Sequence, residues 1–297
     1  MSILVVGSLC IDHTLYVSRL PSPGETVIAQ SSLSSFGGKG ANQALAAKRA
    51  GGDVSFLSCT GDDSAGSDYR THFSDQGINP DSMILDPTVP TGSAFLGVEE
   101  SGENSIIINP GANHALRPEH LDQHLSLFRS ASHLLLQLEI PFDTIQHACH
   151  LAREHRVTTL INPSPWSPDF NTTDFPCDIL IVNEHEAASF LGQTNPELTP
   201  ELLKEHQLQT LVVTQGASAS IALDESIGRI ESTPPTVNPV DTVGAGDAFT
   251  GALAVGLAED RPLKQALHFA NTAAALSILK PGAQGATPQR SEIEASL

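Results

Sequence analysis

The chain has 297 residues, of which 40% are hydrophobic and 16% are charged, a composition that supplies a large core and excludes a disordered or coiled-coil chain. With 15 Lys and Arg against 34 Asp and Glu, the net charge is −19, which disfavours nucleic acids and anionic membranes as partners. The sequence has no apolar run near the roughly 18 residues of a membrane span, no signal-peptide pattern at its start, and only scattered cysteines. We therefore expect a cytoplasmic protein.

Short, continuous apolar runs recur along the chain, and each is about as long as a strand. Runs of this kind, bounded by polar or turn residues, are typical of strands buried on both faces of a parallel sheet. In chain order we expect a strand at 3–6, a helix at 42–50, a strand at 134–138, a helix at 142–155, strands at 158–161, 179–182 and 211–213, and helices at 248–257 and 263–279. This alternation predicts an α/β layer fold.

Two segments, 12–36 and 94–109, interrupt the alternation and resemble β-hairpins. Each contains two short apolar stretches on either side of a turn rich in Gly, Pro or Ser. The strands expected in them lie at 15–17, 26–29, 95–98 and 106–108. They predict a small second sheet that covers one edge of the main layer.

A glycine cluster, Gly37, Gly38 and Gly40, precedes the first expected helix. Glycines there allow close backbone approach, and the helix start offers free N–H groups. Asn42 can hydrogen-bond a hydroxyl-rich ligand as both donor and acceptor. The segment is not a Walker A loop, because Gly40 stands where Ser or Thr is required, and it is not GxGxxG. Taken alone, an ordinary tight turn into a helix explains it equally well.

A second glycine segment, Gly244-Ala245-Gly246, also leads into a helix and is followed by Asp247. Bare amides at a helix start form an anion site, and Asp247 lies in the first turn beside it. A carboxylate next to a bound phosphate makes chemical sense if the phosphate is transferred, since Asp247 can accept the proton of an attacking hydroxyl. Taken alone, a capping Asp on a glycine-opened helix explains this segment equally well.

Taken together, the two segments resemble the two signature motifs of the ribokinase-type (PfkB) carbohydrate kinases, and within that family the ribokinases most closely. The resemblance extends along nearly the whole chain, through Gly7-Ser8, Asp12, Pro23 to Thr26, Gly61 to Asp63, Gln137 to Glu139, Asn162-Pro163, Asn183 to Glu186, Thr214 to Gly216 and Lys280 to Gln284. It implies a single ribokinase-like domain over 1–297, a three-layer sandwich with a central, mostly parallel sheet. Residues 12–36 and 94–109 would form an inserted β lid, which in this family often makes a homodimer.

The resemblance also implies the site residues. The sugar would be held by Cys10, Asp12, Gly38, Lys39, Asn42 and Glu139, with Asp247 facing the reacting hydroxyl and Gly244, Ala245 and Gly246 forming an anion hole. ATP would lie near Asn183, Glu186, Thr214, Gly216, Ser218, Ala219, Gly246 and Asn271, where Asn183 and Glu186 match a motif that helps to organise Mg²⁺. A monovalent cation, usually K⁺, would be held by oxygens of Asp241, Val243, Ser277, Lys280, Gly282 and Ala286.

The implied activity is transfer of the γ-phosphate of ATP to a primary hydroxyl of a pentose, O5 of D-ribose, with Asp247 as the base. Cys10 stands where relatives that act on ribose carry Asn, Ala286 where Ser is usual, and Ala219 where Gly is usual. Relatives that act on 2-deoxyribose carry an apolar residue at the position of Cys10. A kinase of 2-deoxyribose, of another sugar or of a nucleoside therefore stays an alternative. A catalytically silent sugar-binding protein is an alternative of another class, but binding alone does not need Asp247.

Overall fold

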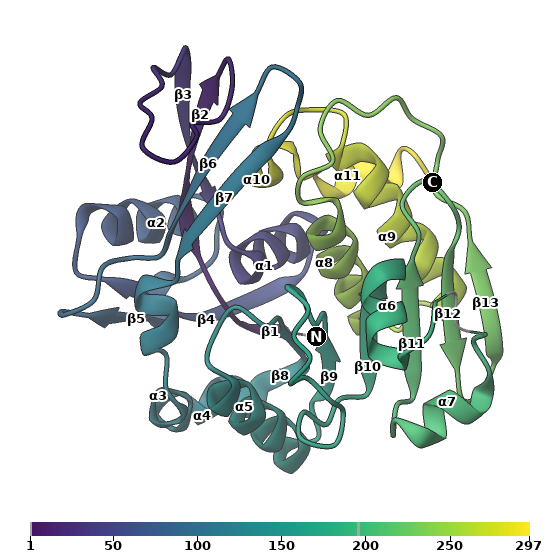
Figure 1. Ribbon diagram of the computed structural model, residues 1–297. Coiled ribbons are helices and arrows are strands. Elements are labelled where there is room, and N and C mark those ends of the chain that lie inside the picture. The colour runs from purple at the N-terminus through teal and green to yellow at the C-terminus, as the bar shows by residue number, and fades with distance from the viewer. Residues whose placement is uncertain (1, 195–196) are drawn as a thin grey trace.

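A nine-stranded sheet forms the centre of the computed structural model, which describes residues 2–194 and 197–297 (Figure 1). The strand order is β13-β12-β11-β10-β9-β8-β1-β4-β5, and every neighbouring pair from β11 to β5 is parallel. Only β12 and β13 are antiparallel to their neighbours. The strands are β1 (Ser2–Val6), β4 (Asp53–Gly61), β5 (Met83–Asp86), β8 (Ala131–Leu136), β9 (Thr158–Ile161), β10 (Ile179–Asn183), β11 (Thr210–Thr214), β12 (Ser220–Asp224) and β13 (Gly228–Ser232).

Helices cover both faces of this sheet, and each face has its own hydrophobic cluster. Along β1, Ile3 and Val5 point into one cluster while Leu4 and Val6 point into the other, as the two-residue period of a strand requires. The first cluster takes residues from α1 (Lys39–Arg49), α2 (Ser64–Asp75), α8 (Ala245–Ala258), α9 (Leu263–Ser277) and α11 (Arg290–Glu294). The second takes residues from α3 (Pro118–Gln123), α4 (Leu125–Ser130), α5 (Phe142–His155), α6 (Glu184–Leu191) and α7 (Pro200–Glu205). A short α10 (Ala283–Ala286) lies between α9 and α11.

The predicted α/β layer fold is confirmed, and each strand and helix expected in the main layer exists. Helix 142–155 and strand 158–161 have the expected bounds, and the other elements differ by a few residues at their ends. Strands β4, β5, β12 and β13 were not among the expected elements. None of the helices in the described part of the chain has the length and apolar character needed to cross a membrane.

A second, four-stranded sheet projects from one side of the layered body (Figure 1). This small sheet consists of β2 (Cys10–Val17), β3 (Ser31–Gly37), β6 (Ser93–Glu99) and β7 (Asn104–Asn109), in the order β3-β2-β6-β7. Both expected hairpins exist, and β2 pairs with β6 in parallel to join them.

The expected strand at 26–29 is wrong. The partner of β2 is Ser31–Gly37, in a register that pairs Gly37 with Cys10, and 26–29 belongs to the connecting loop. Ile28 is 87% exposed in that loop, so its apolar side chain carries no information about a strand. The serine-rich sequence of β3 concealed the true strand because most of its residues face solvent.

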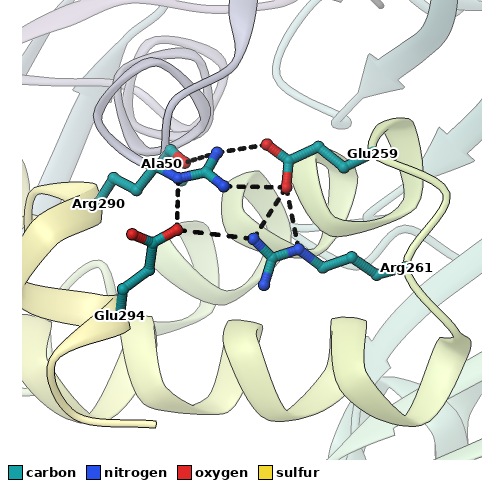
Figure 2. Close-up of polar contacts among 5 residues, drawn as sticks. All are labelled: Ala50, Glu259, Arg261, Arg290 and Glu294. Atoms are coloured by element: carbon teal, nitrogen blue, oxygen red, sulfur yellow. Dashed lines mark hydrogen bonds and ion pairs between the residues drawn. The ribbon is translucent and has the colours of Figure 1, made fainter.

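The C-terminal helix α11 is held against the end of α8 by a cluster of charged side chains (Figure 2). Arg290 contacts both carboxylate oxygens of Glu259, and its Nε donates to Glu294 Oε1 at 2.7 Å. Arg261 also donates to Glu259, at 2.9 Å. Single surface ion pairs contribute little, but a network with two-pronged arginine contacts holds its members in fixed positions. It fixes the far end of the helix whose first turn carries Asp247.

Candidate active site

Three adjoining cavities run along one edge of the main sheet, and Asp247 lies where the first two meet. The first, about 420 Å³, lies under the small sheet; the middle one is about 170 Å³ and the third about 320 Å³. Lys39, Gly244 and Asp247 line both the first and the middle cavity. Ala245 and Gly246 line both the middle and the third. The start of α8 therefore connects all three.

The first cavity contains all seven residues expected to contact a sugar: Cys10, Asp12, Gly38, Lys39, Asn42, Glu139 and Asp247. Its walls come from both sheets of the molecule. One face of the small sheet contributes Asp12, Ala94, Leu96, Ile106 and Ile108, while α1, α8 and the segment after β8 contribute the polar residues opposite. The cavity thus has polar groups on the body and mostly apolar groups on the small sheet.

Gly38 explains why the glycine cluster is needed. It is the N-cap of α1 with φ of 91°, and a Cβ there would lie 2.5 Å from the Cα of Leu9. Only glycine combines that backbone conformation with such a close approach. The helix start therefore packs against the chain that links β1 to β2, which brings Lys39 and Asn42 beside Cys10 and Asp12.

Cys10 and Asp12 form a pair inside the first cavity. The Cys10 thiol donates to Asp12 Oδ1 over 2.9 Å. Burial raises the pKa of Asp12; the thiol opposes this shift, and the nearby Glu139 adds to it. Burial, reinforced by Asp12, also raises the pKa of the Cys10 thiol, so it stays protonated. The thiol therefore donates its only hydrogen to the Asp12 carboxylate.

Glu139 closes the first cavity on the side of the main sheet. Its Oε2 accepts hydrogen bonds from the Ser8 hydroxyl and from the backbone N–H of Lys39, the latter at 2.9 Å. The carboxylate thus stabilises the start of α1, where the positive end of the helix dipole lies. Its other oxygen has no hydrogen-bond partner in residues 2–194 and 197–297, so it can accept from a hydroxyl-rich ligand.

The start of α8 presents free backbone amides. Gly244 is its N-cap, with φ of 78°, and the first full helical bond is Ala248 N–H to Gly244 O at 2.8 Å. Within residues 2–194 and 197–297, no protein group accepts from the N–H of Gly246 or Asp247, and Ala245 makes only a long bond of 3.3 Å. Free amides at a helix start attract an anion, as the sequence predicted for this segment.

Asp247 is buried at this helix start, with only 8% of its surface exposed. Asn42 Nδ2 donates to its Oδ2 at 3.0 Å, and Gln43 Nε2 donates to its Oδ1 at 2.9 Å. Burial raises the pKa of Asp247; Lys39 and the two amide donors oppose this shift, and Glu139 adds to it. A raised pKa suits a group that must take a proton from a hydroxyl near neutral pH.

Asn183 and Glu186 lie at the start of α6 and line the middle cavity. They form a capping box in which Asn183 Oδ1 accepts from Glu186 N–H at 2.8 Å and Glu186 Oε2 accepts from Asn183 N–H at 2.9 Å. The cap fixes both side chains, and the second carboxylate oxygen of Glu186 has no hydrogen-bond partner among the described residues. Hard oxygen ligands of this kind suit Mg²⁺.

The third cavity contains most of the residues expected near a nucleotide: Thr214, Gly216, Ser218, Gly246 and Asn271. Ala219 does not line it, although its neighbours Ser218 and Ser220 do. Asn271 uses its Nδ2 for Ser220 Oγ and Ser232 O, at 2.9 and 2.8 Å, so its oxygen is left for a ligand. The opposite wall is a proline-rich segment that the sequence analysis did not single out: Pro234, Pro235, Thr236, Val237 and Pro239.

Hydrogen bonds join three of the six expected cation ligands directly. Asp241 Oδ1 accepts from Val243 N–H at 3.0 Å, and its Oδ2 accepts from Gly282 N–H at 2.8 Å. The Ser277 hydroxyl donates to Ala274 O, the Lys280 side chain is near Glu292 and largely exposed, and Ala286 is buried in α10. The candidates offer carboxylate, hydroxyl and carbonyl oxygens only, a set that suits a hard cation such as K⁺.

Comparison with known proteins identifies the family. Residues 1–290 match the family described as pfkB family carbohydrate kinase. The chain belongs to this family. The kinase is 36% identical to the ribokinase of Bacillus subtilis (strain 168) over 298 residues, covering 100% of this chain and 99% of the relative. It is 33% identical to the ribokinase of Mus musculus, covering 100% and 94%.

Solved structures agree with this assignment. The kinase resembles the Arabidopsis thaliana ribokinase complexed with ribose and ATP at a TM-score of 0.92 and 30% identity, covering 99% and 97% of the two chains. It resembles the ribokinase of Thermotoga maritima at a TM-score of 0.88 and 34% identity, covering 99% and 98%. A nucleoside kinase from Burkholderia thailandensis, 20% identical, shares the fold at a TM-score of 0.84.

Several polar residues of the site had no role in the sequence analysis. Gln43, Gln137 and Gln284 join a buried network of side-chain amides around Asp247, described below. Asn113, after the small sheet, accepts from Leu9 N–H and donates to Leu9 O, at 2.9 and 2.7 Å. The sequence signal for Gln137 and Gln284 was the family resemblance at these positions, which marked them without indicating their contacts.

Proposed function

We propose that this kinase transfers the γ-phosphate of ATP to O5 of D-ribose. The observation that carries the proposal is the arrangement of the cavities. A cavity lined by carboxylates and amides lies on one side of Asp247, a mostly apolar cavity of nucleotide-binding size lies on the other, and the free amides of α8 lie between them. Such an arrangement suits transfer of an anionic group between two bound molecules. The ribokinase relatives favour D-ribose over the alternative acceptors.

In the proposed reaction the sugar occupies the first cavity and ATP extends from the third cavity into the middle one. Asp247 orients the attacking hydroxyl and accepts its proton as the new bond to the γ-phosphorus forms. The bond from the γ-phosphorus to the bridging oxygen of the β-phosphate breaks in the same step, and ADP leaves with that oxygen. The amides of Ala245, Gly246 and Asp247 stabilise negative charge on the transferring phosphoryl group. Lys39, which lines the first and middle cavities, adds positive charge on the same path.

The proposed metal sites use residues whose chemistry fits them. Asn183 and Glu186 would hold Mg²⁺ through water, and the ion supplies charge neutralisation for the phosphates when bound. Oxygens of Asp241, Val243, Ser277, Lys280, Gly282 and Ala286 would hold K⁺ behind the anion site. Asp241 already joins the loop before α8 to the loop before α10, so it couples this cation site to the shape of the α8 start.

We further propose a single domain over 1–297 in which the small sheet is a lid over the sugar and the contact surface of a cytoplasmic homodimer. One face of the sheet lines the first cavity, and the other is apolar and exposed: Leu15, Phe95 and Ile107 are 43%, 47% and 69% exposed. Exposed apolar patches of this kind mark interaction surfaces.

The test is ADP release by the purified protein with ATP, Mg²⁺ and K⁺, comparing D-ribose with 2-deoxy-D-ribose, fructose and nucleosides. We expect the highest kcat/KM with D-ribose. Asp247→Asn should reduce kcat by about 10²- to 10⁴-fold, because the general base is lost. The exposed residue Asp68 provides the matched control, and Asp68→Asn should leave kcat unchanged.

Three results would contradict the proposal. Wild-type-like turnover by Asp247→Asn would remove the assigned base. A preference for 2-deoxy-D-ribose would shift the substrate and point to Cys10 as the cause. Binding of sugars without any ADP release would favour the silent sugar-binding protein, with calorimetry providing the binding measurement.

A further inference from the structure

Each carboxylate oxygen of Asp247 accepts one hydrogen bond from a side-chain amide, one from Asn42 and one from Gln43. The rest of the structure fixes the orientation of both amides. A side-chain amide presents an oxygen on one side and an NH₂ group on the other, and a carboxylate is stabilised only by the NH₂ side. Asn42 and Gln43 must therefore both be turned with nitrogen toward Asp247. Two chains of buried hydrogen bonds set these orientations.

The first chain starts at the backbone carbonyl of Ile181, which can only accept. Asn162 Nδ2 donates to it at 2.9 Å, so Asn162 presents its oxygen to Gln43, and Gln43 Nε2 donates there at 3.1 Å. The same nitrogen donates to Asp247 Oδ1. Gln43 Oε1 then faces away and accepts from Gln137 Nε2 at 2.7 Å. One backbone carbonyl thus fixes the direction of every bond in the chain.

The second chain starts at the backbone carbonyl of Gly37. The Tyr69 hydroxyl donates to it at 2.6 Å, so the Tyr69 oxygen must accept, and Gln284 Nε2 donates to it at 2.7 Å. The other hydrogen of Gln284 Nε2 goes to Asn42 Oδ1 at 3.0 Å. Asn42 therefore turns its nitrogen to Asp247 Oδ2.

The first chain of hydrogen bonds ends in an unpaired buried oxygen, which lowers the stability of the fold. Gln137 is fully buried, and its Oε1 has no hydrogen-bond partner in the described part of the chain. An orphaned buried acceptor costs about 1–3 kcal/mol. An apolar side chain at this position would exchange this orphaned oxygen for another, Gln43 Oε1, so the stability of the fold does not favour glutamine over an apolar residue.

We infer that Gln137 and Gln284 are positioning residues, which act through Gln43 and Asn42 to hold the Asp247 carboxylate in the orientation that receives the substrate proton. Neither residue lines any of the three cavities. Each carboxylate oxygen keeps a lone pair for the hydroxyl, since one amide hydrogen occupies only part of its accepting capacity. The inference rests on the proposed function, because it concerns how Asp247, the proposed base, is held in place.

The test measures kcat, KM and the pH profile of Gln137→Met and Gln284→Met, which remove the donors at nearly constant length. The charged groups that face Asp247 are Lys39 and Glu139, and neither variant changes them. With the donors misaligned, the ionised carboxylate is stabilised less, so its pKa rises further. Because the base must be ionised, the acid limb of kcat should move to higher pH. We expect kcat to fall about 10- to 100-fold, with a smaller change in the KM for the sugar.

Controls separate positioning from folding and from the proposed function. Gln265→Met, an exposed glutamine on α9, should change nothing. Gln137→Met exchanges one orphaned amide oxygen for another, so its Tm should stay close to that of the wild type. Unchanged kcat and an unchanged acid limb in both variants would overturn the inference, as would a loss of kcat that simply follows a loss of Tm. If Asp247→Asn itself kept its activity, the proposed function would fail instead.

Discussion

At the scale of single residues, Cys10 determines how polar the sugar cavity is. An asparagine at this position would offer a donor and an acceptor to a sugar hydroxyl, whereas the thiol already donates to Asp12 and is a weak acceptor. The raised pKa of Cys10 also keeps it from becoming a thiolate that could accept strongly. We therefore expect the cavity to hold a ligand here mainly through Asp12.

Replacing Cys10 by Asn tests this reasoning. Cys10→Asn should lower the KM for D-ribose about fivefold, since one added hydrogen bond is worth about 1 kcal/mol, and should change the KM for 2-deoxy-D-ribose less. The measurement is steady-state kinetics with both sugars. Cys10→Ala is the control, and it should shift both KM values alike. An equal effect of Cys10→Asn on the two sugars would mean that position 10 does not contact the hydroxyl that distinguishes them.

At the scale of elements, the packing of α1 against α8 determines the site. These helices carry Asn42, Gln43 and Asp247, and they approach closely at Gly251, where a Cβ would lie 2.6 Å from Gln43 O and 2.7 Å from Ala46 Cβ. Any side chain at this position forces the helices apart. The distance from Gln43 to Asp247 would then change with the helix separation.

Gly251→Ala should lower the free energy of unfolding by about 1–3 kcal/mol and reduce kcat, because overpacking separates α1 from α8. Thermal unfolding should show a Tm several degrees lower. Gly285→Ala is the matched control, because a Cβ there has no neighbour within 4 Å. A Gly251→Ala variant as stable as Gly285→Ala would mean that the helices adjust to the extra methyl group without cost.

Elements that local sequence defines could be predicted, whereas pairings between distant segments could not. Helix 142–155 and strand 158–161 were predicted with their bounds because local apolar periodicity and flanking turn residues define them. Strand β4 was missed because Ser55 and Ser58 interrupt its apolar run, although Ser58 is fully buried. The four-stranded sheet was expected, but the register of β3 depends on pairing with β2, which local sequence does not encode.

In the candidate site too, residues in local motifs could be predicted, whereas hydrogen bonds between distant residues could not. Asp247, Asn42 and the glycine segments were predicted because family motifs are local in sequence. The hydrogen bond from Gln137 to Gln43 joins residues 94 positions apart, and that from Gln284 to Asn42 joins residues 242 positions apart. Their orientations depend on backbone carbonyls supplied by other elements, so only the folded chain reveals them.

At the scale of the whole molecule, the two faces of the small sheet have different surroundings. Asp12, Ala94 and Ile108 form one row across the sheet and line the first cavity, whereas the next row, His13, Phe95 and Ile107, points the other way. His13 stacks on Phe95 with the ring centroids 5.2 Å apart. This outer row is the surface proposed for the homodimer.

Ile107→Lys should convert the proposed dimer into monomers, because a charge in the centre of an apolar contact is desolvated without a partner. Light scattering after size exclusion measures the mass. The exposed Ile227, on the turn between β12 and β13, provides the control, and Ile227→Lys should leave the mass unchanged. A monomeric wild type, or a dimeric Ile107→Lys, would show that this face is not the interface.

The division of the first cavity between two sheets has a consequence for how the kinase discriminates among sugars. Asp12 belongs to the small sheet, while Asn42, Glu139 and Asp247 belong to the body, so a ligand that contacts all four draws two separate parts of the molecule together. Binding free energy that is used to bring these parts together lowers the barrier and not only the KM. We therefore expect a sugar that lacks a hydroxyl for Asp12 to be a slow substrate even when it saturates the enzyme, so that selectivity would persist at concentrations where affinity no longer discriminates.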